Sequence, residues 1–110
     1  MINSKAKGKA GELEFAHYLT AHGFPARRGQ QFSGGSESPD VICEILHDVH
    51  FEVKRREKGN PYEWVEQALT DNPAAAVHVV AHRRNQHEWL AILPMEELLR
   101  LLILRDKVLP

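Results

Sequence analysis

The sequence is poor in cysteine and has no long hydrophobic run. Cys43 is the only cysteine among the 110 residues, so the chain forms no internal disulfide and no zinc site built from several thiolates. No apolar stretch approaches the ~20 residues that a membrane-spanning helix requires. The first residues are basic, but the apolar region of a secretory signal does not follow them. We therefore expect a protein that makes no use of a membrane, in a reducing, cytoplasmic setting.

The chain also lacks an excess of charge of either sign. Its formal net charge is -1 at pH 7, a value that does not by itself indicate a nucleic-acid-binding protein. Hydrophobic residues make up 43% of the sequence, enough for one core, and we expect a single domain over residues 1–110. The basic side chains are clustered at positions 5–9, 27–28, 55–58 and 83–84. Such clusters form a phosphate-binding surface only if the fold brings them together, and a solvated face of mixed charge has a similar pattern.

Hydrophobic periodicity and turn residues predict an alternation of helices and strands. We expect helices over residues 4–22, 61–71 and 94–105, and strands over residues 24–31, 41–46, 49–55, 75–82 and 88–93. Ser4 and Asn60 are the expected N-caps, and Gly23 should follow the last turn of the first helix. The order α-β-β-β-α-β-β-α is typical of a layered α/β domain, here a central mixed sheet flanked by helices.

Polar side chains are expected to gather on one face of the hairpin between residues 40 and 55. Glu52 and Lys54 lie on the polar face of the second strand because side chains alternate along a strand. If opposed residues have numbers that sum to an even value, Asp40 joins that face and apolar side chains share the other. We expect this register, which needs a turn of three or more residues around positions 47–48. A tight two-residue turn would produce the opposite register.

These three side chains suggest a metal site that acts on phosphodiesters. The carboxylates of Asp40 and Glu52, with the backbone carbonyl of Val53, are the hard oxygen ligands that Mg²⁺ prefers. A metal held there would lower the pKa of a bound water and neutralise a phosphodiester. Lys54 would then position the attacking water or stabilise charge on the phosphate. An acid–lysine pair alone is common on exposed strands, so the interpretation depends on all three side chains meeting.

The segments SPD at residues 38–40 and EVK at residues 52–54 resemble the signature of the PD-(D/E)XK nuclease superfamily. The order of the surrounding elements is also similar, over roughly residues 5 to 82. The basic, Gly/Ser-rich segment RRGQQFSGG resembles the small Holliday-junction resolvase-like branch. The resemblance implies a restriction-endonuclease-like fold and a Mg²⁺-dependent endonuclease, with Mn²⁺ as a possible substitute, acting on DNA and first of all on branched junctions.

The resemblance also implies a role for each matching residue. Asp40 and Glu52 would be metal ligands, and Lys54 the catalytic lysine. Glu12, in KGKAGELEF, would be a further acid near the metal, and Gln67, in WVEQALTD, would orient water, a ligand or the phosphate. Ser33 or a neighbour in its loop would contact the substrate. The complete set expected to bind DNA is Lys5, Lys9, Arg27, Arg28, Ser33, Arg55 and Arg56.

The seven histidines do not indicate a zinc site. No HExxH segment and no cysteine pair accompanies them, so we predict structural or solvent-facing roles. His50 differs from the others because it lies two positions before Glu52 on the same strand face. From there it could reach the substrate or the metal.

The last predicted helix carries more apolar surface than one core needs. Its leucines and isoleucine at positions 98–104 cover nearly the whole circumference, whereas one buried stripe needs three or four apolar residues in two turns. We expect a homodimer that uses this helix, or the strand of Trp89 next to it. Three alternatives to a junction-cutting nuclease remain open. The first is a nuclease of the same fold acting on duplex or single-stranded nucleic acid. The others are a non-catalytic nucleic-acid-binding module and a dimeric interaction protein whose motif is accidental.

Overall fold

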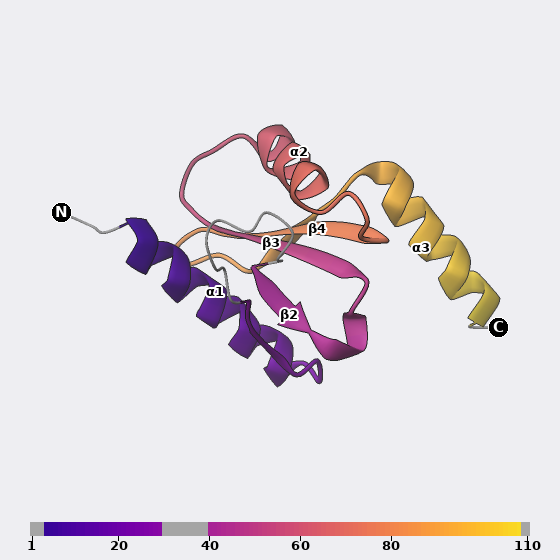
Figure 1. The fold of residues 1–110 in the computed structure, drawn as a ribbon, viewed down its shortest axis with the longest axis horizontal. Helices are drawn as coiled ribbons and strands as arrows, with labels where there is room; N and C mark the ends of the chain where they lie inside the picture. The colour runs from indigo at the N-terminus through magenta and orange to yellow at the C-terminus, as the bar shows by residue number, and fades with distance from the viewer. Residues whose placement is uncertain (1–3, 30–39, 109–110) are drawn as a thin grey trace.

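The computed structural model describes residues 4–29 and 40–108 (Figure 1). The elements, in chain order, are α1 (Ser4–Ala21), β1 (Ala26–Arg28), β2 (Val41–Cys43), the short 3₁₀ helix η1 (Glu44–Leu46), β3 (Val49–Arg55), α2 (Pro61–Asp71), β4 (Val77–Arg83), β5 (Leu90–Ile92) and α3 (Met95–Val108). This order confirms the predicted α-β-β-β-α-β-β-α arrangement. The described chain is a compact α/β domain built on an open sheet.

The sheet has the strand order β1-β2-β3-β4-β5 and is mixed. β3 and β4 run parallel, with pairs from Val49↔Val77 to Arg55↔Arg83, while the other neighbours are antiparallel. A parallel pair requires a crossover connection, and α2 provides it. β1 lies at one edge of the sheet and β5 at the other.

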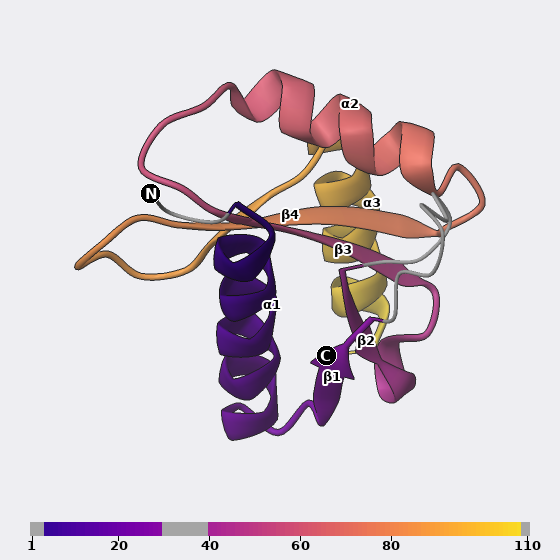
Figure 2. The same cartoon turned by 60° about the vertical axis from the view of Figure 1, so that its left-hand side comes forward.

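The two faces of the sheet are covered by different helices. α1 lies on one face and α2 on the other, as the two views agree (Figures 1 and 2). The larger core joins α1 to β2, β3 and β4 through Phe15, Ala16, Leu19, Val41, Cys43, Phe51 and Ala81. The smaller core joins α2 to β4 through Trp64, Ala68 and Val80. Cys43, with its free thiol, is one of the buried residues of the larger core.

Several predicted boundaries were wrong by a few residues. β2 stops at Cys43 because residues 44–46 form η1, which supplies the long turn that the even register needs. Of the described part of its predicted range, residues 24–29, β1 covers residues 26–28, and β5 covers only residues 90–92. α3 begins at Met95 and continues to Val108, beyond the predicted end. The helix N-cap at Asn60 is confirmed, since its side chain accepts a hydrogen bond from the Tyr62 backbone N–H at 3.0 Å.

α3 is attached to the sheet at its first turn and then projects away from it (Figure 1). The carboxylate of Glu97 accepts a hydrogen bond from the His78 backbone N–H at 2.8 Å and lies 3.0 Å from the His78 ring Nδ1. The other ring nitrogen of His78 lies 2.6 Å from the carbonyl oxygen of Asn72. This buried arrangement gives His78 the structural role predicted for it. Within residues 4–29 and 40–108, no helix is long and apolar enough to cross a membrane.

Candidate active site

Asp40 lies directly opposite Glu52, across the β2–β3 pair. Val41 is the partner of Phe51, and the Asp40 backbone N–H donates to the Phe51 carbonyl oxygen at 3.0 Å. This is the even register expected from the polar and apolar pattern. It places the side chains of Asp40, Glu52 and Lys54 on one face, while Val41 and Phe51 enter the core on the other.

The carboxylates of Asp40 and Glu52 are both buried. Asp40 is 9% exposed and Glu52 only 3%, although buried acids are rare in proteins. One Asp40 oxygen, Oδ2, accepts a hydrogen bond from the Val53 backbone N–H at 2.8 Å, which fixes the side chain beside β3. Burial, followed by repulsion from Glu52, raises the pKa of Asp40 from 3.8 to about 7, and the negative charge of Glu12 adds to the effect. The site therefore concentrates negative charge where water gives little screening.

Lys54 directs its ammonium group toward Glu52 on β3 and Gln67 on α2. Its Nζ donates a hydrogen bond to Oε1 of Gln67 at 2.8 Å and lies 3.8 Å from Oε2 of Glu52. The lysine comes from β3 and the glutamine from α2, so the crossover helix that packs on this face also aims the lysine. The structure thus brings together Glu52, Lys54 and Gln67, as expected from the resemblance.

Glu12 approaches the site from α1, which lies on the face of the sheet opposite to α2. Gly11 allows this approach, because a side-chain carbon at position 11 would lie 2.7 Å from Cβ of Arg55 on β3. The Glu12 carboxylate forms an ion pair with Nε of Arg28 at 2.6 Å. Its charge still contributes to the raised pKa of Asp40, so Glu12 belongs to the electrostatic surroundings of the site.

His50 holds the second carboxylate in place. Its Nε2 lies 3.0 Å from Oε1 of Glu52, and the ring is only 1% exposed. The other ring nitrogen, Nδ1, is buried without a hydrogen-bond partner among the described residues. The strand period had placed His50 beside Glu52, but only the structure shows that the ring is enclosed and faces the carboxylate.

The arginines expected to bind DNA differ in how much they are engaged inside the protein. Arg28 pairs with Glu12, as described above. Arg55 pairs with Glu14 at 3.0 Å and donates a hydrogen bond to Asn85. Arg27 forms an exposed pair with Glu44.

Two further cations, Arg56 and Lys9, are exposed. Ser33 and the side chain of Lys5 lie outside the described residues. The DNA-binding role of the whole set stays a prediction.

The donor set suits a hard divalent cation that keeps most of its water. Mg²⁺ commonly binds one or two carboxylates together with water and substrate phosphate, and Asp40, Glu52 and the Val53 carbonyl supply donors of that kind. In the part of the chain that the structure describes, no group of three or more histidine, cysteine or acidic side chains is arranged to hold a metal ion. The buried pair with its raised Asp40 pKa fits an open site.

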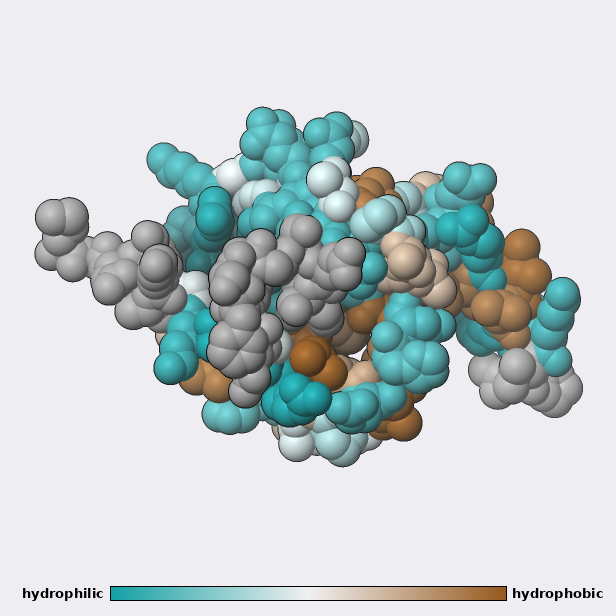
Figure 3. All heavy atoms as spheres, viewed as in Figure 1, coloured by the Kyte–Doolittle hydropathy of each residue, from teal (hydrophilic) through white to brown (hydrophobic). Residues whose placement is uncertain are grey.

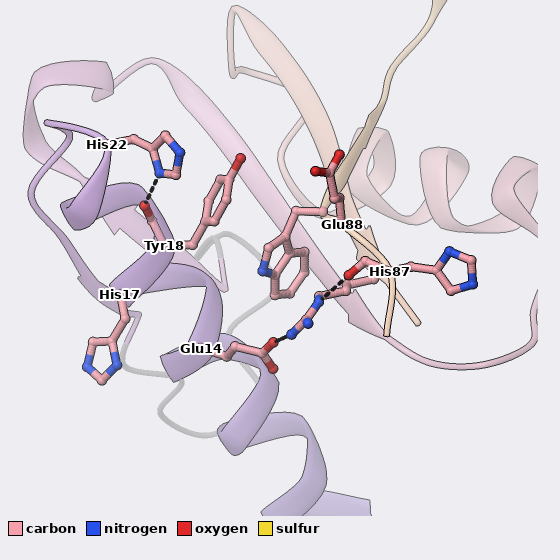
Figure 4. A pocket seen from close by; sticks show the side chains of 8 residues that line it. Glu14, His17, Tyr18, His22, His87 and Glu88 are labelled. Atoms are coloured by element: carbon pink, nitrogen blue, oxygen red, sulfur yellow. Dashed lines mark hydrogen bonds and ion pairs between the residues drawn. The ribbon is translucent and has the colours of Figure 1, made fainter. Parts of the chain in front are cut away.

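A separate polar pocket of about 590 Å³ lies between α1 and the turn from β4 to β5 (Figure 4). Glu14 and Arg83 form an ion pair across it, and Arg83 also donates to the His87 carbonyl oxygen at 2.6 Å. His17 and His87 lie on opposite sides of Glu14 in Figure 4 and do not converge. None of the residues expected in the nuclease site lines this pocket.

Comparison with known proteins assigns no family to the chain. No family model, no curated protein and no solved structure matches it. The function must therefore be argued from the geometry of the site and from the motif that its residues form.

Proposed function

We propose that the protein is a metal-dependent endonuclease of the PD-(D/E)XK superfamily, with the restriction-endonuclease-like fold, that hydrolyses DNA phosphodiester bonds. The observation that carries the proposal is the convergence of Asp40, Glu52, Lys54 and Gln67 on one face of the sheet. Residues from β3, α2 and the start of β2 meet there. A solvated strand face would not require the two acids to be buried.

Each side chain has a separate task in this proposal. Asp40, Glu52 and the Val53 carbonyl would hold Mg²⁺, or Mn²⁺ in its place, which would supply positive charge for the phosphate and lower the pKa of a water molecule. His50 keeps Glu52 in position through its hydrogen bond. Lys54 stabilises the negative charge that develops on the phosphate, and Gln67 holds the ammonium group at the correct place.

Branched DNA, in the manner of a Holliday-junction resolvase, is the substrate that we propose. The RRGQQFSGG segment and the short domain resemble that branch, and a homodimer would provide two active sites for two strands. The buried free thiol of Cys43 suits the cytoplasm. Exposed cations such as Lys9 and Arg56 would contribute the phosphate contacts.

The test is cleavage of labelled four-way junction, duplex and single-stranded DNA with Mg²⁺, Mn²⁺ or a chelator. The wild type should cut the junction in a metal-dependent manner, and Asp40→Asn should not cut it. Asp48→Asn, which removes an exposed acid at a turn, is the matched control and should cut normally. Cleavage of duplex or single strands in preference to the junction would correct the substrate. Tight binding without cleavage under every metal condition would make the protein a non-catalytic binding module.

A further inference from the structure

The projecting part of α3 exposes large apolar side chains to water. Leu99, Ile103 and Leu104 are 50%, 56% and 57% exposed, and Leu101 and Leu102 are 39% exposed. Hydrophobic atoms are accordingly visible along this helix, at the right of Figure 3. A helix with apolar residues around its circumference is stable only when other surfaces cover it. Its first turn is tied to the sheet through Glu97 and His78.

A largely apolar groove lies at the base of the same helix. It has a volume of about 640 Å³ and runs between α2 and the start of α3. Its walls include Tyr62, Val65, Leu69, Ile92, Leu93 and Met95. Tyr62 is 82% exposed and Met95 is 66% exposed, so a second apolar surface faces water beside the first.

We propose that the α3 helix of a second copy of this chain occupies the groove, and that the contact is reciprocal. In this dimer the two α3 helices run antiparallel past each other. The tip of each helix lies in the groove at the base of the other. A helix of 14 residues is about 21 Å long, which sets the separation of the two bases. One chain carries both halves of the contact, which is what a two-fold dimer requires.

Charge complementarity favours this arrangement over a parallel one. The last turn of α3 carries Arg105 and Lys107 together with Asp106, which pairs with Arg105 at 2.9 Å, so its net charge is positive. The first turn carries Glu96 and Glu97 and is acidic. The groove adds a further acid, Glu66, on its α2 wall. Antiparallel helices bring each basic tip to the acidic base of the partner. A parallel pair would place acids against acids and bases against bases, which costs free energy.

Reciprocal docking also covers more apolar surface than a one-sided contact would. A stable interface buries on the order of 800 Å² on each partner, and groove and helix together offer apolar surface on both sides of the contact. The helix or the groove alone would give only one such surface. Reciprocal docking uses both at once and covers the exposed leucines of both copies.

The first test is analytical ultracentrifugation, which needs no nuclease activity and therefore succeeds or fails independently of the proposed function. The wild type should sediment as a dimer at micromolar concentration. Leu104→Glu on the helix and Leu69→Glu on the groove wall should each yield a folded monomer, checked by circular dichroism. Ile45→Glu is the matched control, because Ile45 is 61% exposed on η1, outside α2, β5 and α3, and this variant should stay dimeric.

A charge-reversal cycle tests the antiparallel orientation. Arg105→Glu and Glu66→Arg should each weaken the dimer about tenfold or more, and the double variant should recover most of the loss. Single variants Tyr62→Cys and Leu104→Cys, mixed and oxidised, should form a disulfide-linked dimer, and buried Cys43 should not interfere. A monomeric wild type overturns the proposal. So does a dimer that survives both leucine variants, or one whose double charge variant is no tighter than the single variants.

Discussion

Replacing Asp40 by asparagine should stabilise the metal-free protein at pH 8, although it removes a proposed metal ligand. The asparagine oxygen still accepts the hydrogen bond from the Val53 N–H, so the local geometry survives. What disappears is a buried negative charge beside Glu52. We expect a protein that has lost cleavage and gained free energy of unfolding, as is common where function requires clustered charge.

The size of this stability difference follows from the pKa of Asp40. The ordinary pKa of the side chain is 3.8, and in the folded protein it is about 7. Below pH 3.8 the carboxyl is protonated in both states and contributes no pH dependence. Between these values the unfolded chain releases the proton while the folded chain keeps it, so the wild type loses stability as pH rises. One pKa unit corresponds to about 1.4 kcal/mol, which gives a total loss on the order of 4 kcal/mol by pH 7 and above.

The assay is urea unfolding of wild type and Asp40→Asn in chelator at pH 5, 6, 7 and 8. Fluorescence of Trp64 and Trp89, which pack in the two cores, reports the transition. The gap in unfolding free energy should widen by about 1.4 kcal/mol per unit up to pH 7 and then stay constant. Asp48→Asn controls for the loss of one exposed carboxylate. Equal stability of Asp40→Asn and wild type at pH 8, or a gap independent of pH, would refute the reasoning.

Metal addition should narrow the gap in stability between Asp40→Asn and the wild type. An ion that binds only the folded state at a concentration a hundredfold above its dissociation constant adds about 2.7 kcal/mol. Mg²⁺ at pH 8 should therefore stabilise the wild type and leave Asp40→Asn unchanged. Equal stabilisation of both proteins would place the bound ion elsewhere.

Variants at three further positions separate the tasks of the proposed site and of its DNA-binding surface. Lys54→Met should keep Mg²⁺ binding, measured by calorimetry, but slow single-turnover cleavage by about 10²-fold or more, because it removes charge stabilisation at the phosphate; an unchanged rate would remove the lysine from the reaction. His50→Leu should weaken Mg²⁺ binding about tenfold, because it releases Glu52, while His50→Gln should retain more of the affinity; equal affinities in both variants would contradict the positioning role. Arg56→Ala should reduce the salt dependence of duplex binding by about 0.9 in the slope of log K against log salt, and an unchanged slope would place the DNA on another surface.

Local sequence patterns were sufficient to predict much of the fold. The cap at Asn60 with Pro61 behind it defined the start of α2, and the alternation of β3 defined both its limits and its polar face. The even register between β2 and β3 was predictable because only that register places the polar side chains of both strands on one face and the apolar ones on the other. The boundaries that failed are those where few residues decide the outcome. The chain from Glu44 to Leu46 reads as a strand, but there it must turn between two antiparallel partners and forms η1.

The order of elements, the opposition of Asp40 to Glu52 and the apolar surplus of α3 were determined by the sequence alone, because each depends on local periodicity and spacing. Only the tertiary structure decided that His50 is enclosed against Glu52, that Arg28 and Arg55 pair with acids of α1, and that a groove lies at the base of α3. These features join segments that are far apart in the chain. Their distances and burial depend on how α1 and α2 pack across the sheet, which no local pattern encodes.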